Sequence, residues 1–138
     1  MTPVHLDDVK VLLDICFGDS AWSMESLCSQ LEKADSRCTV AVEDGTVVGF
    51  LAFEQVLDEG SIVEIAVHPA YRRQGIAKEM ILSAISDNSL KEIYLEVRES
   101  NLPAIRLYES LGFEKAGVRN GYYDSPKEDA VLMRLERK

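Results

Sequence analysis

The sequence contains few of the residues that build disulfide frameworks and metal centres. Among its 138 residues are three cysteines and two histidines. The cysteines, Cys16, Cys28 and Cys38, are odd in number and show no C-x-x-C spacing, which argues against a disulfide framework and a structural zinc site. We therefore expect no metal, and three reduced thiols favour a cytoplasmic protein.

The chain also lacks long apolar runs and an excess of basic residues. No apolar run reaches the length of a membrane span, and the N-terminal MTPVHLDDVK lacks the basic-then-apolar order of a secretory signal. Fifteen basic residues against 24 acidic ones give a net charge of −9, which argues against nucleic acid or an anionic membrane as a partner. An amine or a basic peptide suits this charge, although acidity also serves solubility alone.

The residues that are present form alternating helical and strand patterns. A length of 138 residues with 46% hydrophobic residues suits one domain, residues 1–138, without a repeat or a linker. Helical spacing of apolar residues predicts helices over 9–16, 24–31, 76–85 and 104–111. Alternation and turn signals predict strands over 38–43, 46–57, 61–67, 91–98, 113–119 and 129–136. The predicted fold is a mixed α/β domain.

Local signals mark where several of these elements begin and end. Ser23 and Asn101 are suited to cap the second and fourth helices, because their side-chain oxygens can accept a hydrogen bond from a first-turn amide. Asp44-Gly45 predicts a hairpin turn between the first two strands. A second turn is expected at residues 58–60, before the third strand.

Residues 72–77, RRQGIA, lie between a predicted strand and the start of a helix. The first turn of a helix has unpaired N–H groups and partial positive charge, and glycine lets the backbone approach a ligand closely. With the arginine and glutamine donors, this stretch can form an anion cradle suited to a pyrophosphate. A basic pair before a helix is also often simply solvated. The pattern is neither G-x-x-x-x-G-K-[ST] nor G-x-G-x-x-G, which disfavours ATP and dinucleotides.

The same region carries a resemblance to a known family. The R-x-x-G-x-A pattern after the strand EIAVHP resembles the acetyl-CoA signature of the GNAT N-acetyltransferases. The stretches LEVRESNLPAIRLYESLGF and VRNGYYDSPKEDAVLM are similar to the ribosomal-protein-alanine N-acetyltransferases, the RimI group. The resemblance is dense over residues 61–135. Before that it comprises only the AWS triplet near Trp22, the helix pair and the hairpin, and Ala21 stands where the group usually has a proline.

The resemblance implies a fold, a cofactor and a reaction. We expect the GNAT fold, with a mixed central sheet of about six or seven strands flanked by about four helices. Acetyl-CoA would be the co-substrate, and its acetyl group would pass directly to a primary amine. The expected acceptor is the N-terminal α-amine of a protein, such as a ribosomal protein that starts with alanine. The chain is expected to act as a monomer or a weak dimer.

Two residues are predicted to be catalytic. Glu96 interrupts an apolar strand, where partial burial would make it a base, and the matching glutamate of the group has this role. Alternation alone also fits a solvated strand face shared with Tyr94 and Arg98. Tyr108 lies on an apolar helix stripe, where core packing is the default, but the resemblance places its phenol at the thioester sulfur as an acid. Glu64 is the rival base, or it orients the substrate amine.

The resemblance also implies binding residues on both sides of the reaction centre. The predicted acetyl-CoA contacts are Ile65, Ala66, Val67, Arg72, Arg73, Gln74, Gly75, Ile76, Ala77, Lys78 and Asn101. Asn101 has the competing role of helix cap. Tyr122 and Tyr123 are expected in a loop between the last two strands, where Tyr122 contacts the acceptor. Trp22 is expected to face it from the other side, although a lone tryptophan is more often part of a core.

The choice of acceptor follows partly from amine chemistry. A peptide α-amine has a pKa of about 8 and a lysine side chain about 10.4, so a weakly perturbed carboxylate is better matched to the α-amine. Two alternatives remain open from the sequence. One is acetylation of a small amine such as a polyamine, an amino acid or a drug. The other is a domain that binds CoA without transferring anything.

Overall fold

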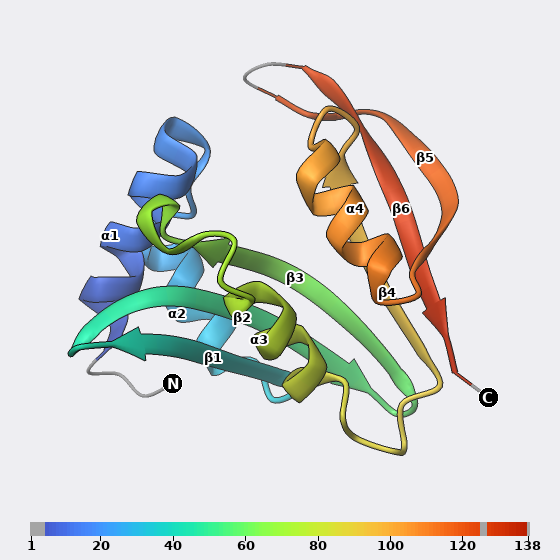
Figure 1. Cartoon of the computed structure of the whole chain (residues 1–138), viewed down its shortest axis with the longest axis horizontal. Coiled ribbons are helices and arrows are strands. Elements are labelled where there is room, and N and C mark those ends of the chain that lie inside the picture. The colour runs from blue at the N-terminus through green and yellow to red at the C-terminus, as the bar shows by residue number, and fades with distance from the viewer. Residues whose placement is uncertain (1–4, 125–126, 138) are drawn as a thin grey trace.

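The computed structural model describes residues 5–124 and 127–137 and has a mixed α/β architecture (Figure 1). Two helices come first, followed by a two-stranded hairpin, two strand–helix units and a final pair of strands. The helices are α1 (Leu6–Phe17), α2 (Met24–Glu32), α3 (Ile76–Ala84) and α4 (Leu102–Ser110), with short 3₁₀ turns η2 (Gly18–Ser20) and η3 (Pro69–Tyr71). The strands are β1 (Ser36–Glu43), β2 (Thr46–Val56), β3 (Glu59–Val67), β4 (Glu92–Arg98), β5 (Glu114–Tyr123) and β6 (Glu128–Glu136). The predicted α/β fold class is confirmed.

The helix boundaries follow from the capping residues of the sequence. The Ser26 N–H donates to Ser23 Oγ at 3.0 Å, and the Ala104 N–H donates to Asn101 Oδ1 at 3.3 Å, so both predicted caps form. Gly112, just past α4, has a φ of +100°, a conformation that glycine adopts without strain.

Two predicted loop boundaries are wrong. The turn between β2 and β3 lies at residues 57–58, and Gly60 lies inside β3. A side chain at Gly60 would bring its Cβ within 2.5 Å of Phe53 Cζ, so this glycine serves close packing and not a turn. Tyr122 and Tyr123 lie at the end of β5 and not in a loop, because Tyr123 still pairs with Glu128 of β6.

One six-stranded sheet, in the order β1-β2-β3-β4-β6-β5, separates two layers of helices. Helices α1 and α2 cover one face, where Leu12, Leu13 and Leu27 pack on Phe50. Helices α3 and α4 cover the other face, where Met80, Ile81 and Tyr108 pack on Leu51, Phe53, Ile93 and Leu95. Strand β2 is apolar on both faces because helices cover both, which is why its sequence VVGFLAF does not alternate.

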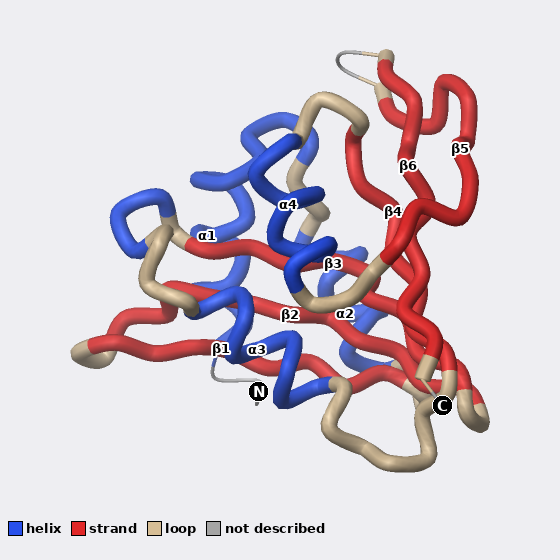
Figure 2. Tube along the Cα trace, turned by 45° about the vertical axis from the view of Figure 1, so that its right-hand side comes forward, coloured by secondary structure: helices blue, strands red, loops and turns tan. Residues whose placement is uncertain are grey.

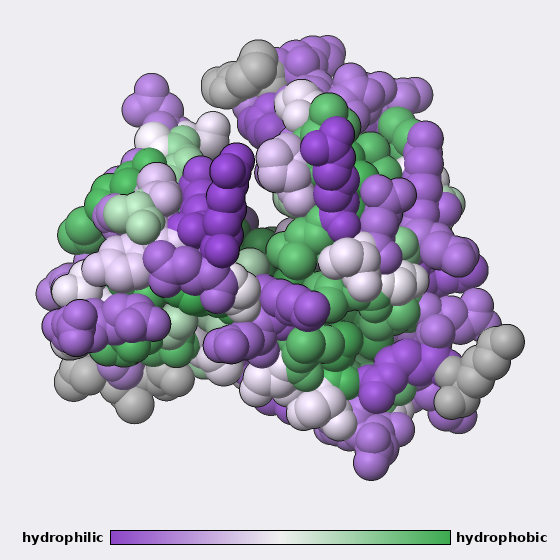
Figure 3. Space-filling view, in the orientation of Figure 1, coloured by the Kyte–Doolittle hydropathy of each residue, from purple (hydrophilic) through white to green (hydrophobic). Residues whose placement is uncertain are grey.

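The two central strands separate along their length. Strands β3 and β4 pair in parallel only from Glu59 with Glu92 to Ile62 with Leu95. Beyond this point they diverge (Figures 1 and 2), and the space-filling view shows a notch between the two halves of the molecule (Figure 3). A cleft thus opens at the carboxyl ends of this parallel pair, which is where α/β folds usually hold ligands. Among the described residues, no helix is long and apolar enough to cross a membrane.

Candidate active site

Four ionisable side chains from four elements meet at the cleft. They are Glu64 of β3, Glu96 of β4, Tyr108 of α4 and Tyr123 of β5. The charge of Glu64 contributes to the raised pKa of both tyrosines, and that of Glu96 contributes to the raised pKa of Tyr123. Charges act over longer distances in a partly buried setting than in water, so these effects link the four side chains without requiring direct contact. The fold therefore gathers both candidate bases, the candidate acid and one further tyrosine at a single place.

A β-bulge places Glu64 at the cleft. Ala52 pairs with Glu64 but Phe53 pairs with Ile62, so Val63 is an extra residue in β3. The bulge shifts the alternation, and Ile65 instead of Glu64 packs in the apolar cluster that contains Ile62. Simple alternation would have put Glu64 on the face of Ile62.

The Glu64 carboxyl is half-buried and has an unusual pKa. Its Oε1 accepts a hydrogen bond from the Ile65 N–H at 3.2 Å. Burial raises the pKa of Glu64 to about 7, and this hydrogen bond opposes the shift only in part. Glu64 therefore exchanges a proton near neutral pH, as a general base requires.

This pKa has a consequence for stability. The folded-state value of about 7 lies above the unfolded value, so the ionised carboxylate destabilises the fold at pH 8 but not at pH 4, where it is protonated. Glu64→Gln should raise the free energy of unfolding by up to about 3 kcal/mol at pH 8, and the gain should vanish as pH falls from about 7 to 4. Urea unfolding at pH 4, 6 and 8 measures this, with the exposed Glu114→Gln as control. An equal gain at all three pH values would show that Glu64 is not desolvated.

Glu96 is held by an ion pair on one side only. Arg119 Nη1 donates to Glu96 Oε1 at 2.8 Å, and the Arg119 guanidinium lies 4.7 Å from the centre of the Tyr122 ring. Glu96 Oε2 is buried and has no hydrogen-bond partner. A buried carboxylate oxygen without a partner costs free energy, which a bound cation or donor would recover. Alternation alone allowed Glu96 to lie on a solvated strand face. In the structure one of its oxygens is buried and the other is held by an ion pair.

Tyr108 is buried, with 5% of its surface exposed, and packs edge-on against Phe113 at 5.9 Å between ring centres. Burial, followed by the charge of Glu64, raises the pKa of Tyr108 well above its usual value. The phenol therefore keeps its proton at neutral pH. Core packing and a proton-donating role are compatible at this position, because the ring packs while the phenol keeps its proton and feels the charge of Glu64.

The predicted cofactor segment forms a strand end and an open helix N-terminus. Gly75 precedes α3 with a φ of +80°, and Arg73 also has a positive φ of +65°. Nothing lies within 4 Å of a Cβ built on Gly75, so glycine is needed here for its conformation and not for space. The Arg72 Nε donates to the Val67 carbonyl at 3.1 Å, which turns this side chain back toward β3.

The exposures in this segment agree with an open anion site. Five of the predicted cofactor residues in this segment are exposed: Arg72, Arg73, Gln74, Gly75 and Lys78. Ile76 is buried and anchors the first turn of α3 in the apolar cluster. The helix therefore begins at an anchored first turn beside exposed basic and polar side chains, an arrangement that is compatible with phosphate binding. Contact of these residues with acetyl-CoA stays a prediction.

The other predicted site residues differ in their burial and contacts. Trp22 is half-buried and lies edge-on to Phe50 at 6.4 Å between ring centres, so it packs in the core between α1, α2 and the sheet. Tyr122 is 50% exposed and contacts Tyr123 at 5.0 Å between ring centres. Whether Trp22 or Tyr122 touches an acceptor stays a prediction. Asn101 forms the predicted cap, and its cofactor role is likewise untested.

The resemblance puts Tyr123 at the acceptor groove together with Tyr122, but the sequence assigned a contact only to Tyr122. Burial raises the pKa of Tyr123 to about 12, with further contributions from the charges of Glu96, Tyr122 and Glu64. The adjacent tyrosines Tyr122 and Tyr123 indicate an acceptor site. Adjacent strand residues point to opposite sides, however, and only the register decides which of the two faces the cleft. Among the described residues, no group of His, Cys, Asp or Glu side chains is arranged to hold a metal ion.

Comparisons with known proteins agree with this architecture. The model of the acetyltransferase (GNAT) family matches residues 6–113. The [ribosomal protein bS18]-alanine N-acetyltransferase of Escherichia coli K12 is 40% identical over 98 residues, which cover 67% of this chain and 66% of that protein. A putative enzyme of the same description from Bacillus subtilis is 33% identical over 136 residues, 94% of this chain and 90% of that protein.

A solved structure is similar over nearly the whole chain. The crystal structure of the ribosomal-protein-S18-alanine N-acetyltransferase from Escherichia coli superposes with a TM-score of 0.89 at 30% identity, covering 99% of this chain and 90% of that one. The family match over residues 6–113, the sequence relatives and this superposition lead to one conclusion. The chain belongs to the GNAT acetyltransferase family, and within it is similar to the ribosomal-protein-alanine N-acetyltransferases.

Proposed function

We propose that this protein transfers the acetyl group of acetyl-CoA directly to the N-terminal α-amine of a protein, such as an S18-type ribosomal protein that begins with alanine. The observation that carries the proposal is the meeting of two unlike carboxylates and a buried phenol where β3 and β4 diverge. The names of the relatives in E. coli and B. subtilis support the acceptor class. The three free thiols favour a cytoplasmic setting.

We infer that the two carboxylates divide the work on the amine. Glu96, fixed through Oε1 by Arg119, offers its buried Oε2 to the incoming α-ammonium. Glu64, with its pKa of about 7, takes the proton that the ammonium must lose before it can attack. The sequence favours Glu96 as the base. The desolvation of Glu64 and the ion pair of Glu96 favour Glu64 as the base instead, with Glu96 binding the ammonium.

Tyr108 is suited to the other end of the reaction. The departing thiolate needs a proton, and a free thiol has a pKa of about 8.5, so the demand on the donor is modest. The raised pKa of Tyr108 keeps a proton available on its phenol at neutral pH. The charge of Glu64 reaches Tyr108, so base and acid lie on the same cleft.

Direct transfer is favoured over an acyl-enzyme. The cysteine near this site is Cys16 of α1, whose Sγ lies 3.4 Å from the Val67 carbonyl. Burial raises the pKa of Cys16, which keeps it as a thiol and makes it a poor nucleophile.

A panel of acceptors tests the proposal. Peptides that begin with Ala, Ser, Gly or Met, a lysine-containing peptide with a blocked N-terminus, free lysine and spermidine would each be incubated with acetyl-CoA while thiol release is followed. We expect α-acetylation of the unblocked peptides at least about tenfold faster than lysine side chains, since neutralising lysine costs about 3 kcal/mol more at pH 7. Mass spectrometry locates the acetyl group.

Two outcomes would contradict the proposal. Turnover confined to spermidine or to lysine side chains would make the protein a small-amine or side-chain acetyltransferase. Thermal stabilisation by acetyl-CoA without turnover of any amine would make it a binding module.

A further inference from the structure

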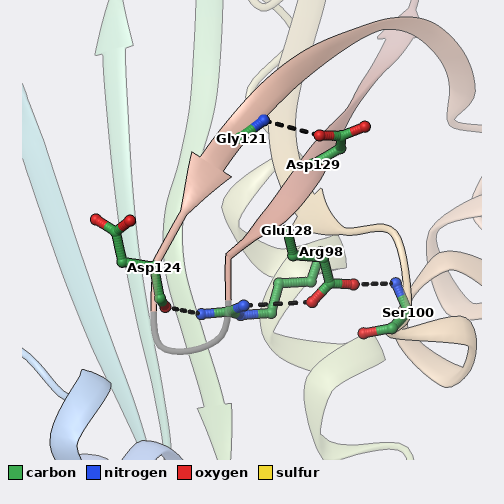
Figure 4. Close-up of polar contacts among 6 residues, drawn as sticks. All are labelled: Arg98, Ser100, Gly121, Asp124, Glu128 and Asp129. Carbon is green, nitrogen blue, oxygen red and sulfur yellow. Dashed lines mark hydrogen bonds and ion pairs between the residues drawn. The ribbon is translucent and has the colours of Figure 1, made fainter.

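A set of hydrogen bonds joins the loop after β4 to the hairpin formed by β5 and β6 (Figure 4). Arg98 Nη1 donates to Glu128 Oε1 at 3.2 Å, and Arg98 Nη2 donates to the Asp124 carbonyl at 2.8 Å. The second oxygen of Glu128 accepts from the Ser100 N–H at 2.6 Å. We call Arg98, Ser100, Asp124 and Glu128 the hairpin clasp.

The ion pair at the centre of the clasp is largely shielded from solvent, whereas Ser100 and Asp124 are exposed. The side chains of Arg98 and Glu128 are only 25% and 12% exposed, and both Glu128 oxygens are used. The hydrogen bonds from Ser100, and then the contact with Arg98, hold the pKa of Glu128 below its usual value. A planar guanidinium and a carboxylate fixed at both oxygens define an orientation, which a freely rotating surface pair does not.

The clasp lies where the strand ladder is interrupted. Arg119 pairs with Ala130 and Tyr123 pairs with Glu128, so four steps along β5 match two along β6. Ladder hydrogen bonds are lost in such a bulge, and the extra residues need other support. The Gly121 N–H finds it in Asp129 Oδ1 at 2.7 Å (Figure 4), and the clasp supports the Tyr123 side of the same bulge.

Tyr123 links the clasp to the cleft. The Arg98 guanidinium lies over the Tyr123 ring at 4.5 Å from its centre. The charges of Glu96 and Glu64 also reach Tyr123, so the ring borders the clasp and the two cleft carboxylates. A cation stacked on a partly buried ring holds it in place.

We propose, on the basis of the function proposed above, that Arg98 is a positioning residue for the acceptor: the hairpin clasp holds the Tyr123 ring as a fixed wall of the cleft, against which the first residues of the acceptor peptide bind. The predicted cofactor residues of β3 and α3 lie outside the clasp, and Asn101, which follows Ser100, is held by backbone and capping hydrogen bonds that do not use the Arg98 side chain. Loss of the clasp therefore weakens acceptor binding and leaves acetyl-CoA binding intact.

Arg98→Met tests this positioning role. It keeps a long apolar side chain but removes the hydrogen bonds and the stacked charge. We expect the KM for an α-amine peptide to rise about tenfold, because an acceptor site that is no longer held in place must be ordered when the peptide binds. The kcat should stay within about threefold of wild type. The Kd of acetyl-CoA, measured by calorimetry, should not change. Arg98→Lys should recover part of the loss, because it restores the cation without the planar fork.

Matched variants separate positioning from general stability. Arg37→Met removes another arginine that lies over an aromatic ring, Phe53 at 5.4 Å, on strand β1, and should leave the KM unchanged. Tyr123→Ala should raise the KM as much as Arg98→Met, and the double variant should add less than about twofold, since both changes remove the same wall. Additive effects of the two changes would overturn the proposal.

Further outcomes bear directly on the proposal. An unchanged KM in Arg98→Met, or equal losses in acetyl-CoA binding and in kcat, would overturn it.

If wild type acetylated no amine, the proposed function would fail separately, and a tyrosine titration at 295 nm would still test the clasp. Burial raises the pKa of Tyr123 to about 12 in wild type, and the charge of Arg98 lowers it. Loss of Arg98 with the ring still in place would therefore raise this pKa further, whereas release of the ring from its buried site should bring it toward the ordinary value of about 10. An unchanged or higher pKa of Tyr123 in Arg98→Met would rule the clasp out.

Discussion

Glu64→Gln is expected to lower kcat/KM for peptide acetylation by about 10²–10⁴-fold, the usual contribution of a general base. Glutamine has nearly the same shape and can still accept the Ile65 N–H hydrogen bond, but it cannot take a proton. The expected defect is therefore chemical. Because the same substitution is predicted to stabilise the fold at pH 8, lost activity could not be attributed to unfolding.

The pH profile identifies the base. Glu64 works as a base only when ionised, so wild-type kcat/KM should rise with pH through about 7. In Glu64→Gln this limb should disappear and leave the ionisation of the substrate α-amine, at about pH 8. Steady-state rates between pH 5.5 and 9 with one peptide provide the comparison.

Glu96→Gln is the informative partner variant. Its loss should appear mainly as a higher KM for the amine, because Glu96 is proposed to bind the ammonium through Oε2. If Glu96→Gln instead abolished kcat while Glu64→Gln kept the wild-type profile, Glu96 would be the base, as the family resemblance implies.

Tyr108→Phe is expected to lower kcat by about 10- to 100-fold, at the lower end of what a general acid contributes. The ring, its contact with Phe113 and the core volume are preserved, so the melting temperature and the Kd of acetyl-CoA should stay close to wild type. Thiol release at saturating acetyl-CoA and peptide measures the effect. Tyr94→Phe, which removes the hydroxyl that donates to Glu92 on the same sheet, serves as the control.

The leaving group provides a sharper form of this experiment. An acetyl thioester of a more acidic thiol needs less help from a proton donor, so Tyr108→Phe should approach wild-type rates with it. A defect of the same size with both thioesters would mean that Tyr108 only packs. Unchanged turnover with acetyl-CoA itself would lead to the same conclusion.

The helices, the strands and the turn before α3 follow from local sequence. The four helices form where apolar residues recur at helical spacing, and Ser23 and Asn101 cap two of them as predicted, because a cap needs only neighbouring amides. The stretch around Gly75 forms the expected turn before α3, since its positive φ depends on glycine itself. Such features are decided within a few residues along the chain.

The chemistry of the cleft was decided by tertiary structure. The pKa of Glu64 depends on a bulge in β3 and on burial by distant segments, neither of which alternation reveals. Glu96 gains Arg119 from β5, and the register of that strand brings Tyr123 within reach of the charges of Glu96 and Glu64. Periodicity specifies which residues form a strand, but desolvation and ion pairing depend on which strands become neighbours and in what register. That arrangement exists only once the chain has folded.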